Sequence, residues 1–308
     1  MFAVSFFSIL CVVIFLTMLY RFMDREGLIL DQRSRSALVG DFINLNKGVV
    51  YYEKSDPSRK PNVVLVHGFS TPSFIWNSTY THLADSGHSV LRFDLYGRGL
   101  SDRPNTAYDM NLYVEQLKEL LDQLAVDKPV TLIGVAMGGT ITTMFANRYP
   151  ERVKKLTLIA PLIVLPSKPD LQVFRIPLIG EYLSKVILVK KLRQGLTDLV
   201  YDASLYPLWN AKFDIQTNYQ GYARAMLSTI RNLANKDFKA EFSNLKTLNK
   251  PIQLIWGRND ALIPIEDSQL ILDVVADNEF HIINNAGHLP HFEQPAEVNP
   301  KILSFLDL

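Results

Sequence analysis

"LIGVAMGGT" at residues 132–140 decides the fold of this 308-residue chain. An apolar run enters this stretch and ends at Val135, and a helical pattern begins at Gly138. Ala136 lies at the turn between them, with Gly134 and Gly138 two residues away on either side. We expect glycine at both places because a strand and a helix joined by so sharp a turn approach too closely for side chains. The stretch therefore predicts a strand, a tight turn and a helix, with residue 136 at the tip.

Charge and cysteine content exclude several classes of protein. The chain has 32 Lys and Arg against 31 Asp and Glu, so its net charge of +1 gives no basic footprint for a nucleic-acid partner. Its one cysteine, Cys11, rules out an internal disulfide framework, and the sequence has no ligand cluster typical of a metal site. We therefore expect no nucleic-acid partner, no metal and no other cofactor.

The first segment is typical of a membrane anchor. Residues 2–20, FAVSFFSILCVVIFLTMLY, carry no charge, and about 20 apolar residues can cross a bilayer as a helix. A signal peptide would have a basic start and a small-residue cleavage site, and neither is visible. We predict a single-pass anchor over residues 1–20 and a juxtamembrane linker over 21–39. By the positive-inside rule, the main domain faces the cytoplasm, because the span is followed by Arg21, Arg25, Arg33 and Arg35.

Beyond the linker, strand-like and helix-like patterns alternate. Several strand-like runs are continuously apolar, as expected of parallel strands covered on both faces by helices. The strand-like runs are 49–53, 62–67, 89–94, 130–135, 155–160, 252–257 and 280–284, and the helical patterns are about 111–125, 138–149, 265–276 and 296–306. The alternation predicts an α/β fold with a mainly parallel sheet, and the earliest run suits an antiparallel edge strand.

One long interval interrupts the alternation. Roughly ninety residues separate the runs 155–160 and 252–257, which is too long for a loop inside a compact domain. The interval has helical patterning and several prolines. We predict a helical cap over residues 162–249, inserted into a core that comprises residues 40–161 and 250–308.

Four further motifs follow predicted strands, and together with "GVAMGG" they carry a family resemblance. They are "HGFS" (67–70), "DLYGRGLSDRP" (94–104), "GRNDALIP" (257–264) and "NNAGHLPHFEQP" (284–295). In this order, the five motifs resemble the α/β-hydrolase family, within its cap-bearing esterase, lipase and carbon–carbon hydrolase branches. The resemblance extends from about Gly40 to the C-terminus. The chain departs from it at residue 136, where the family pattern has serine.

The resemblance implies a role for each residue of the site. The family order of nucleophile, acid and histidine matches Ala136, Asp260 and His288. A histidine activates the serine hydroxyl, and the acid holds that histidine in the required tautomer. The oxyanion hole would consist of the backbone N–H groups of Phe69 and Met137.

Three residues compete with these assignments. His291 is the nearest alternative to His288 as the base, and Asp94 also ends a strand and could replace Asp260 as the acid. We expect Asp94 to orient loops around the site. We expect His67 to shape the oxyanion loop rather than to act as a base.

Alanine at position 136 removes the one oxygen that the chemistry needs. The turn is expected to hold this residue at positive φ, which costs a non-glycine residue roughly 1–3 kcal/mol. A chain that had long ceased to be an enzyme would have no reason to keep this strain together with an intact acid, base and oxyanion loop. We therefore interpret the chain as an inactivated Ser-to-Ala form. The alternative is a natural, non-catalytic binding protein.

The substrate class follows from the cap and the anchor. The first part of the cap, residues 161–196, is rich in Leu, Ile and Val, although some of these residues must form cap core. With serine in place, we expect hydrolysis of a carboxylic ester through an acyl-enzyme, on a lipid such as a monoacylglycerol. The anchored, cap-bearing chain resembles the monoacylglycerol-lipase-like branch. A carbon–carbon bond hydrolase and an acyl-protein thioesterase remain open alternatives.

Overall fold

The central element of the fold is one eight-stranded sheet. The computed structural model describes residues 2–164, 172–233, 236–275 and 278–307. The strand order is β1-β2-β4-β3-β5-β6-β7-β8. Strands β3 to β8 run parallel, and β1 and β2 complete the sheet in antiparallel pairing. The strands are β1 (Asp41–Leu45), β2 (Gly48–Lys54), β3 (Val63–Val66), β4 (Val90–Phe93), β5 (Val130–Val135), β6 (Val153–Ile159), β7 (Ile252–Gly257) and β8 (Asn278–Ile283).

Two of the sequence predictions differ from the structure in detail. The run 49–53 is antiparallel, as predicted, but it is not the edge strand, because Asp41–Leu45 pairs along its outer side. The helix predicted over 265–276 is two short pieces, η7 (Ile265–Ser268) and α13 (Gln269–Leu272). Two β-branched residues, Val274 and Val275, follow after Asp273, and their low helix propensity favours an early end. The predicted last residue, Ala276, lies outside the described residues.

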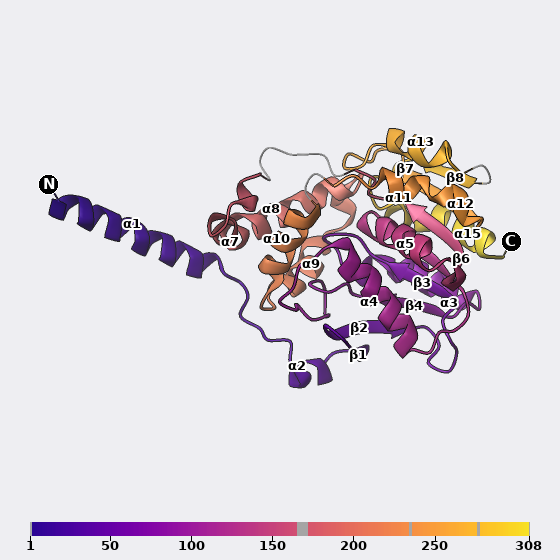
Figure 1. The fold of residues 1–308 in the computed structure, drawn as a ribbon, viewed down its shortest axis with the longest axis horizontal. Coiled ribbons are helices and arrows are strands. Elements are labelled where there is room, and N and C mark those ends of the chain that lie inside the picture. Colours follow the sequence, from indigo (N-terminus) through magenta and orange to yellow (C-terminus); the bar gives the residue numbers. More distant parts are fainter. Residues whose placement is uncertain (1, 165–171, 234–235, 276–277, 308) are drawn as a thin grey trace.

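Helices cover both faces of the sheet (Figure 1). Side chains of successive residues on β3 enter different cores: Val64 and Val66 pack with Leu117 of α4, whereas Val63 and Leu65 pack with α3 and α15. This alternation is expected for a strand buried on both sides. One face carries α4 (Met110–Gln123), α5 (Met137–Arg148), α11 (Lys239–Ser243), α12 (Leu245–Leu248) and α13. The other carries α3 (Asn77–Asp85), α14 (Pro290–Glu293) and α15 (Pro295–Asp307), with the short η1 (Ser73–Trp76) before α3. The short η2 (Pro150–Arg152) follows α5 and contacts it.

The chain between β6 and β7 contains a series of short helices that we call the cap, using the predicted bounds 162–249. Besides α11 and α12, the described cap helices are η3 (Val173–Arg175), α7 (Ile179–Leu183), the π-helical η4 (Ser184–Leu188), α8 (Val189–Gln194), η5 (Gly195–Leu199), η6 (Ala203–Leu205), α9 (Trp209–Thr217) and α10 (Tyr222–Leu233). In Figure 1 those from α7 to α10 lie beside the sheet, at the end nearer the N-terminal helix, whereas α11 and α12 lie over the sheet. Residues 165–171 and 234–235 of the predicted cap lie outside the described part.

The N-terminal helix α1 (Phe2–Met23) projects away from the rest of the protein (Figure 1). Its segment Phe6–Met23 is long and apolar enough to cross a membrane, with a mean hydropathy of 2.2 and none of it buried. At its C-terminal end it contacts the cap, where the Tyr182 hydroxyl donates to Leu16 O (3.0 Å) and the Tyr20 and Tyr182 rings stack.

The juxtamembrane linker is docked on the cap. The Glu26 carboxylate accepts hydrogen bonds from Gly221 N (2.9 Å) and Ala223 N (2.6 Å) at the start of α10. Leu28 pairs with Tyr219 in a β-bridge. Lys185 of the cap binds Asp24 at 2.5 Å, and the short helix α2 (Gln32–Ser36) supplies Arg35, which pairs with the core residue Asp102. These contacts give the anchor a defined orientation relative to the cap.

Candidate active site

The turn after β5 has the strained geometry that the sequence predicts. Ala136 has φ 52° and ψ −121° and lies directly before the first residue of α5. A Cβ on Gly138 would lie 2.2 Å from Val66 O, and one on Gly134 would lie 2.5 Å from Gly138 O. Because both obstacles are backbone atoms, only glycine fits at these two positions. The close packing of β5 and α5 therefore holds Ala136 in an unfavourable conformation.

Asp260 and His288 form a buried pair at the carboxyl edge of the sheet. Asp260 follows β7 and His288 follows β8. The His288 Nδ1 lies 2.8 Å from Asp260 Oδ2, and both side chains are almost fully buried. The other carboxylate oxygen of Asp260 accepts from Leu262 N (2.8 Å) and Ile263 N (2.9 Å). A proton on Nδ1 satisfies the carboxylate and leaves Nε2 of His288 as a proton acceptor.

The loop after β3 lies against Ala136. A Cβ on Gly68 would be 3.2 Å from the Ala136 Cβ. His67 has no exposed surface, and its Nε2 accepts from Leu95 N (2.9 Å), so its proton must be on Nδ1, which donates to Gly68 O (2.9 Å). Burial lowers the pKa of His67 to about 4, which keeps the ring neutral.

The hydrogen bond from His67 orients the amide predicted for the oxyanion hole. Gly68 O and Phe69 N belong to one peptide unit, and the described chain has no cis peptide. The N–H of Phe69 therefore points away from the carbonyl that His67 holds. The second predicted donor, Met137 N, is the first residue of α5, where no carbonyl of the same helix can accept its hydrogen. With both ring nitrogens used, His67 has the loop-shaping position that the sequence predicts.

The other two competitors lie in different environments. The Asp94 carboxylate accepts from Ser73 N and Leu100 N, both at 2.8 Å, and so ties together two loops. His291 has no exposed surface and stacks on Trp76 with ring centroids 4.1 Å apart. Within the described part of the chain, neither ring nitrogen of His291 has a hydrogen-bond partner, and burial lowers its pKa to about 3. No acid orients His291, in contrast to His288.

Two residues that hold the oxyanion loop were not identified from the sequence. The Arg98 Nε donates to Phe69 O (3.0 Å), and this buried guanidinium also contacts the Tyr113 hydroxyl. Gln216 of α9 donates to Ser70 O (2.8 Å) and accepts from Gly99 N (3.0 Å), so the cap contacts the loop directly. Arg98 lies in the motif 94–104, although nothing there reveals its partner. Gln216 stands in no motif.

Apolar side chains of the cap belong to the same buried cluster as the turn. Ala136 belongs to one buried cluster that includes Trp209 and Phe213 of α9 and Leu199 of η5. Phe69 and Phe292 pack against this cluster.

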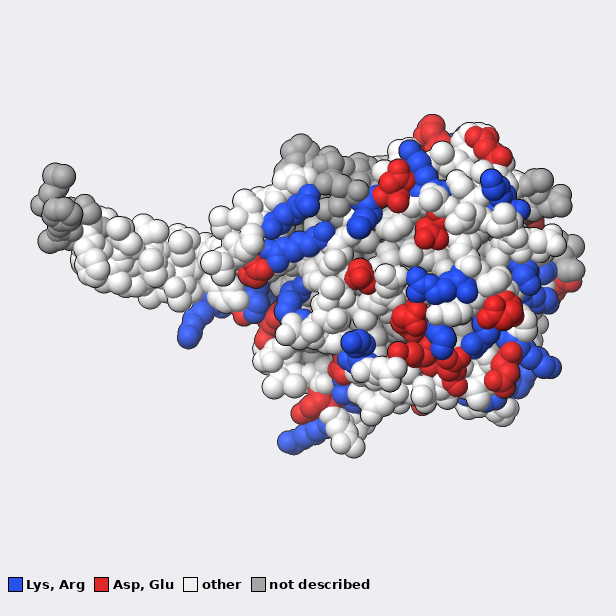
Figure 2. Space-filling model, viewed as in Figure 1, with Lys and Arg blue, Asp and Glu red and all other residues white. Residues whose placement is uncertain are grey.

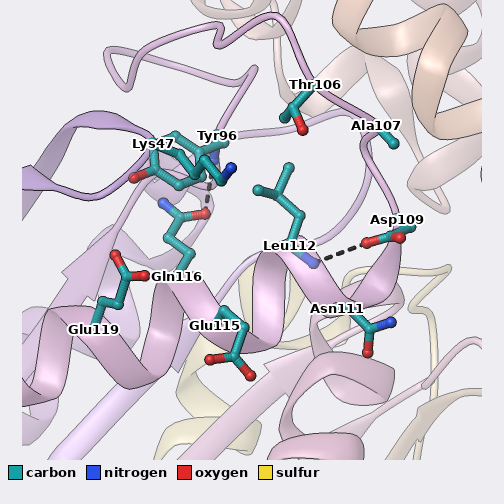
Figure 3. Close-up of a pocket in the computed structure, with 10 residues that line it drawn as sticks. All are labelled: Lys47, Tyr96, Thr106, Ala107, Asp109, Asn111, Leu112, Glu115, Gln116 and Glu119. Carbon is teal, nitrogen blue, oxygen red and sulfur yellow. Dashed lines mark hydrogen bonds between the residues drawn. The ribbon is translucent and has the colours of Figure 1, made fainter.

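A cavity of about 300 Å³ opens elsewhere, between the β1–β2 turn and α4 (Figure 3). Its polar groups are used within the fold: Gln116 Oε1 accepts from Tyr96 N (2.9 Å), and Asp109 caps α4 by accepting from Leu112 N (2.9 Å). The predicted site residues are not part of its lining. Among the described residues, no group of three or more His, Cys, Asp or Glu side chains is arranged to hold a metal ion.

Comparisons with known proteins agree with this fold. The chain is similar to a 2-hydroxy-6-oxononadienedioate/2-hydroxy-6-oxononatrienedioate hydrolase of Klebsiella pneumoniae, at 28% identity over 89% of this chain and 98% of that protein. It is also similar to the mouse (Mus musculus) monoacylglycerol lipase ABHD6, at 23% identity over 83% and 78%. Among solved structures, an esterase from Exiguobacterium antarcticum superposes with a TM-score of 0.75 at 19% identity, covering 88% of this chain and all of that one. The model of the alpha/beta hydrolase fold family matches residues 61–295. The chain therefore belongs to the α/β-hydrolase fold family.

Proposed function

We propose that this site, with serine at position 136, hydrolyses carboxylic esters through an acyl-enzyme. The observation that carries the proposal is the buried Asp260–His288 pair, whose loop shares a buried cluster with the elbow through Ala286, Leu289 and Ala136; the elbow lacks only the nucleophilic oxygen. In the first step the serine oxygen bonds to the ester carbon while His288 Nε2 takes its proton. The N–H groups of Phe69 and Met137 stabilise the oxyanion, and the alcohol leaves with the proton from His288. Water then repeats the sequence on the acyl-enzyme and releases the acid.

We propose further that Ala136 makes the chain a binding-competent but inactive form. The strain at φ 52° has no function in a protein that only binds, whereas a nucleophile needs this elbow. Ala136→Ser should raise kcat by several orders of magnitude, on the order of 10⁶ where the triad acts as a unit. A fluorophosphonate probe should label the Ala136→Ser protein and leave the Ala136 protein unlabelled.

A matched variant tests the assignment of the base. In the Ala136→Ser protein, His288→Ala should abolish turnover and labelling, and Asp260→Asn should reduce both severely because the imidazole loses its orientation. If the folded Ala136→Ser protein neither hydrolyses esters nor reacts with the probe, the enzyme proposal fails. A non-catalytic binding protein would then be the better interpretation.

The preferred substrate is a lipid ester such as a monoacylglycerol. The aromatic and aliphatic surroundings of Ala136 suit an acyl chain, and α1 would keep the site at a bilayer where such lipids reside. The similarity to a monoacylglycerol lipase supports this choice. An acyl-protein thioesterase would use the same residues, and assays of the Ala136→Ser protein with thioesters would identify it.

We propose that α1 is a single-pass anchor and that the enzyme domain faces the cytoplasm. Arginines follow the span and support this orientation under the positive-inside rule. Protease added outside sealed cells should leave the domain intact. Its digestion from that side would refute the orientation without touching the proposed chemistry.

A second candidate is hydrolysis of a carbon–carbon bond. The similarity to the Klebsiella hydrolase covers almost the whole of both chains and favours it. The name of that enzyme's substrate denotes two carboxylates, which call for cationic partners. The buried guanidinium at the oxyanion loop, that of Arg98, already donates to Phe69 O, the Tyr113 hydroxyl and Thr229 Oγ1. We therefore place it second. The Ala136→Ser protein would decide by its relative kcat/KM on a monoacylglycerol and on a ring-cleavage dienedioate.

A further inference from the structure

Glu293 connects the loop of the histidine to the cap. Its Oε1 accepts from Gly287 N (2.9 Å) and Leu289 N (3.3 Å), the two amides that flank His288. Its Oε2 accepts from Tyr201 N (2.5 Å), which belongs to the cap. One partly buried carboxylate thus holds three backbone N–H groups from two parts of the fold. Burial raises the pKa of Glu293, and the three N–H donors oppose that shift by stabilising the charged form.

The cap segment 199–201 also contacts the histidine loop directly. His288 N donates to Leu199 O (3.0 Å). A Cβ on Gly287 would lie 3.0 Å from both Tyr201 N and the carbonyl carbon of Val200. On its other side, the loop lies against the end of β7, because a Cβ on Gly257 would lie 1.9 Å from Gly287 O. The backbone that carries His288 is therefore enclosed between the strand that precedes Asp260 and the cap.

We propose that Glu293 is a positioning residue that fastens cap segment 199–201 to the His288 loop, so that the Asp260–His288 pair is aligned only while the cap is docked. Its effect on kcat rests on the proposed function, whereas its effect on the alignment of Asp260 and His288 does not. The Asp260–His288 bond is buried and single, so a small displacement of the loop lengthens it. Docking of cap segment 199–201 and alignment of His288 with Asp260 are therefore coupled.

Glu293→Gln is the sharpest variant. Glutamine keeps one oxygen for Gly287 N and Leu289 N, but it turns an NH₂ group toward Tyr201 N, so a donor meets a donor. Glu297→Gln is the matched control, because Glu297 is exposed and reaches only Lys301 at 3.9 Å. From the cap side, Tyr201→Pro removes the same N–H, and Val200 already has the extended backbone that a following proline requires. Tyr201→Ala keeps the N–H and controls for the loss of an exposed ring.

The first measurement needs no turnover and uses the full chain with Ala136. The Nδ1 proton of His288 should give a far-downfield NMR resonance, assigned by its loss in Asp260→Asn. Glu293→Gln and Tyr201→Pro should broaden or shift this resonance, and Glu297→Gln and Tyr201→Ala should leave it unchanged. If Glu293→Gln fails to fold, the comparison of Tyr201→Pro with Tyr201→Ala decides. If Tyr201→Pro fails to fold, the comparison of Glu293→Gln with Glu297→Gln decides. An unchanged resonance in the folded Glu293→Gln or Tyr201→Pro protein would overturn the proposal.

The second measurement uses the Ala136→Ser protein. Glu293→Gln should lower kcat at least tenfold with KM within about twofold, because base alignment is lost while the pocket is kept. Combining Glu293→Gln with Tyr201→Pro should add little, since both break one link. Fully additive effects would show two independent roles and contradict the coupling. If Ala136→Ser is inactive, the proposed function fails. The His288 resonance in the Ala136 protein still tests whether Glu293 positions the His288 loop.

Discussion

His288 and His291 lie three residues apart, and their surroundings give them different roles. His288 has an acid at 2.8 Å, whereas His291 is enclosed by hydrocarbon and Trp76. The pKa of His291 in the folded protein is about 3, against about 6.5 in an unfolded chain. A histidine with a lowered pKa contributes stability above its unfolded value, and this contribution is lost as the pH falls toward the folded value.

His291→Phe should therefore stabilise the protein, and more so in acid. Phenylalanine keeps the ring on Trp76 and removes two unpartnered nitrogens. At pH 5 the neutral histidine costs the folded state about 2 kcal/mol relative to pH 8, a cost that phenylalanine does not have. Urea unfolding of the His291→Phe and parent proteins at both pH values measures the difference between their free energies of unfolding. A difference that is equal at pH 5 and pH 8 would show that His291 is not held neutral.

The position of a site residue in the fold was predictable where the local sequence determines it. Asp260 and His288 follow strands, so their meeting at the carboxyl edge could be expected, and the structure brings them together. Glu293 and Gln216 act through contacts with chain about 90 residues or more away, and neither spacing nor motif indicates such contacts. Tertiary hydrogen bonds to backbone amides leave no trace in a sequence.

At the scale of elements, the packing of β5 against α5 and β3 decides the shape of the site. Strands β3, β5 and β7 were predictable because every residue in them is buried, which makes their sequences mainly apolar. Strand β1 was missed because it pairs on one side only and the polar residues Asp41 and Asn44 interrupt its apolar pattern. The docked linker was missed because its contacts, like that of Glu26 with α10, are long-range.

Gly138→Ala should test how tightly these elements are packed. The new methyl group would meet Val66 O at 2.2 Å and His67 O at 2.6 Å, and backbone in a sheet has little freedom to move. We expect a loss of about 3 kcal/mol or more in the free energy of unfolding. Gly195→Ala is the control, because Gly195 has φ −70° and open space around its Cα. It should be neutral or stabilise by about 0.5 kcal/mol. Similar small effects of both changes would contradict the packing argument.

At the scale of the whole molecule, α1, the linker and the cap form one unit. Figure 2 shows α1 without charged side chains over most of its length and Lys and Arg gathered over the neighbouring cap, whereas both signs mix over α4. The basic side chains include Lys190 and Lys191 of α8. Tyr20 and Tyr182 lie where the helix meets the cap, a position that suits aromatic side chains at a membrane surface. With α1 in a bilayer, helix α7 would lie at the headgroup level.

The exposed apolar residues of this region give the last prediction. Leu178 is 83% exposed directly before α7, with Ile176 and Ile179 exposed beside it, so a bilayer would cover all three. Leu178 already holds φ 66° and ψ −46° with a non-glycine side chain that points largely into solvent, so Leu178→Asp should not disturb the fold. In the Ala136→Ser protein it should lower the rate on monoacylglycerol in vesicles about tenfold, since burying one leucine is worth about 1.5–3 kcal/mol, and spare a soluble short ester. Leu270→Asp on α13 should affect neither rate. Equal rates of the Leu178→Asp and parent proteins on vesicles would place α7 outside the membrane surface.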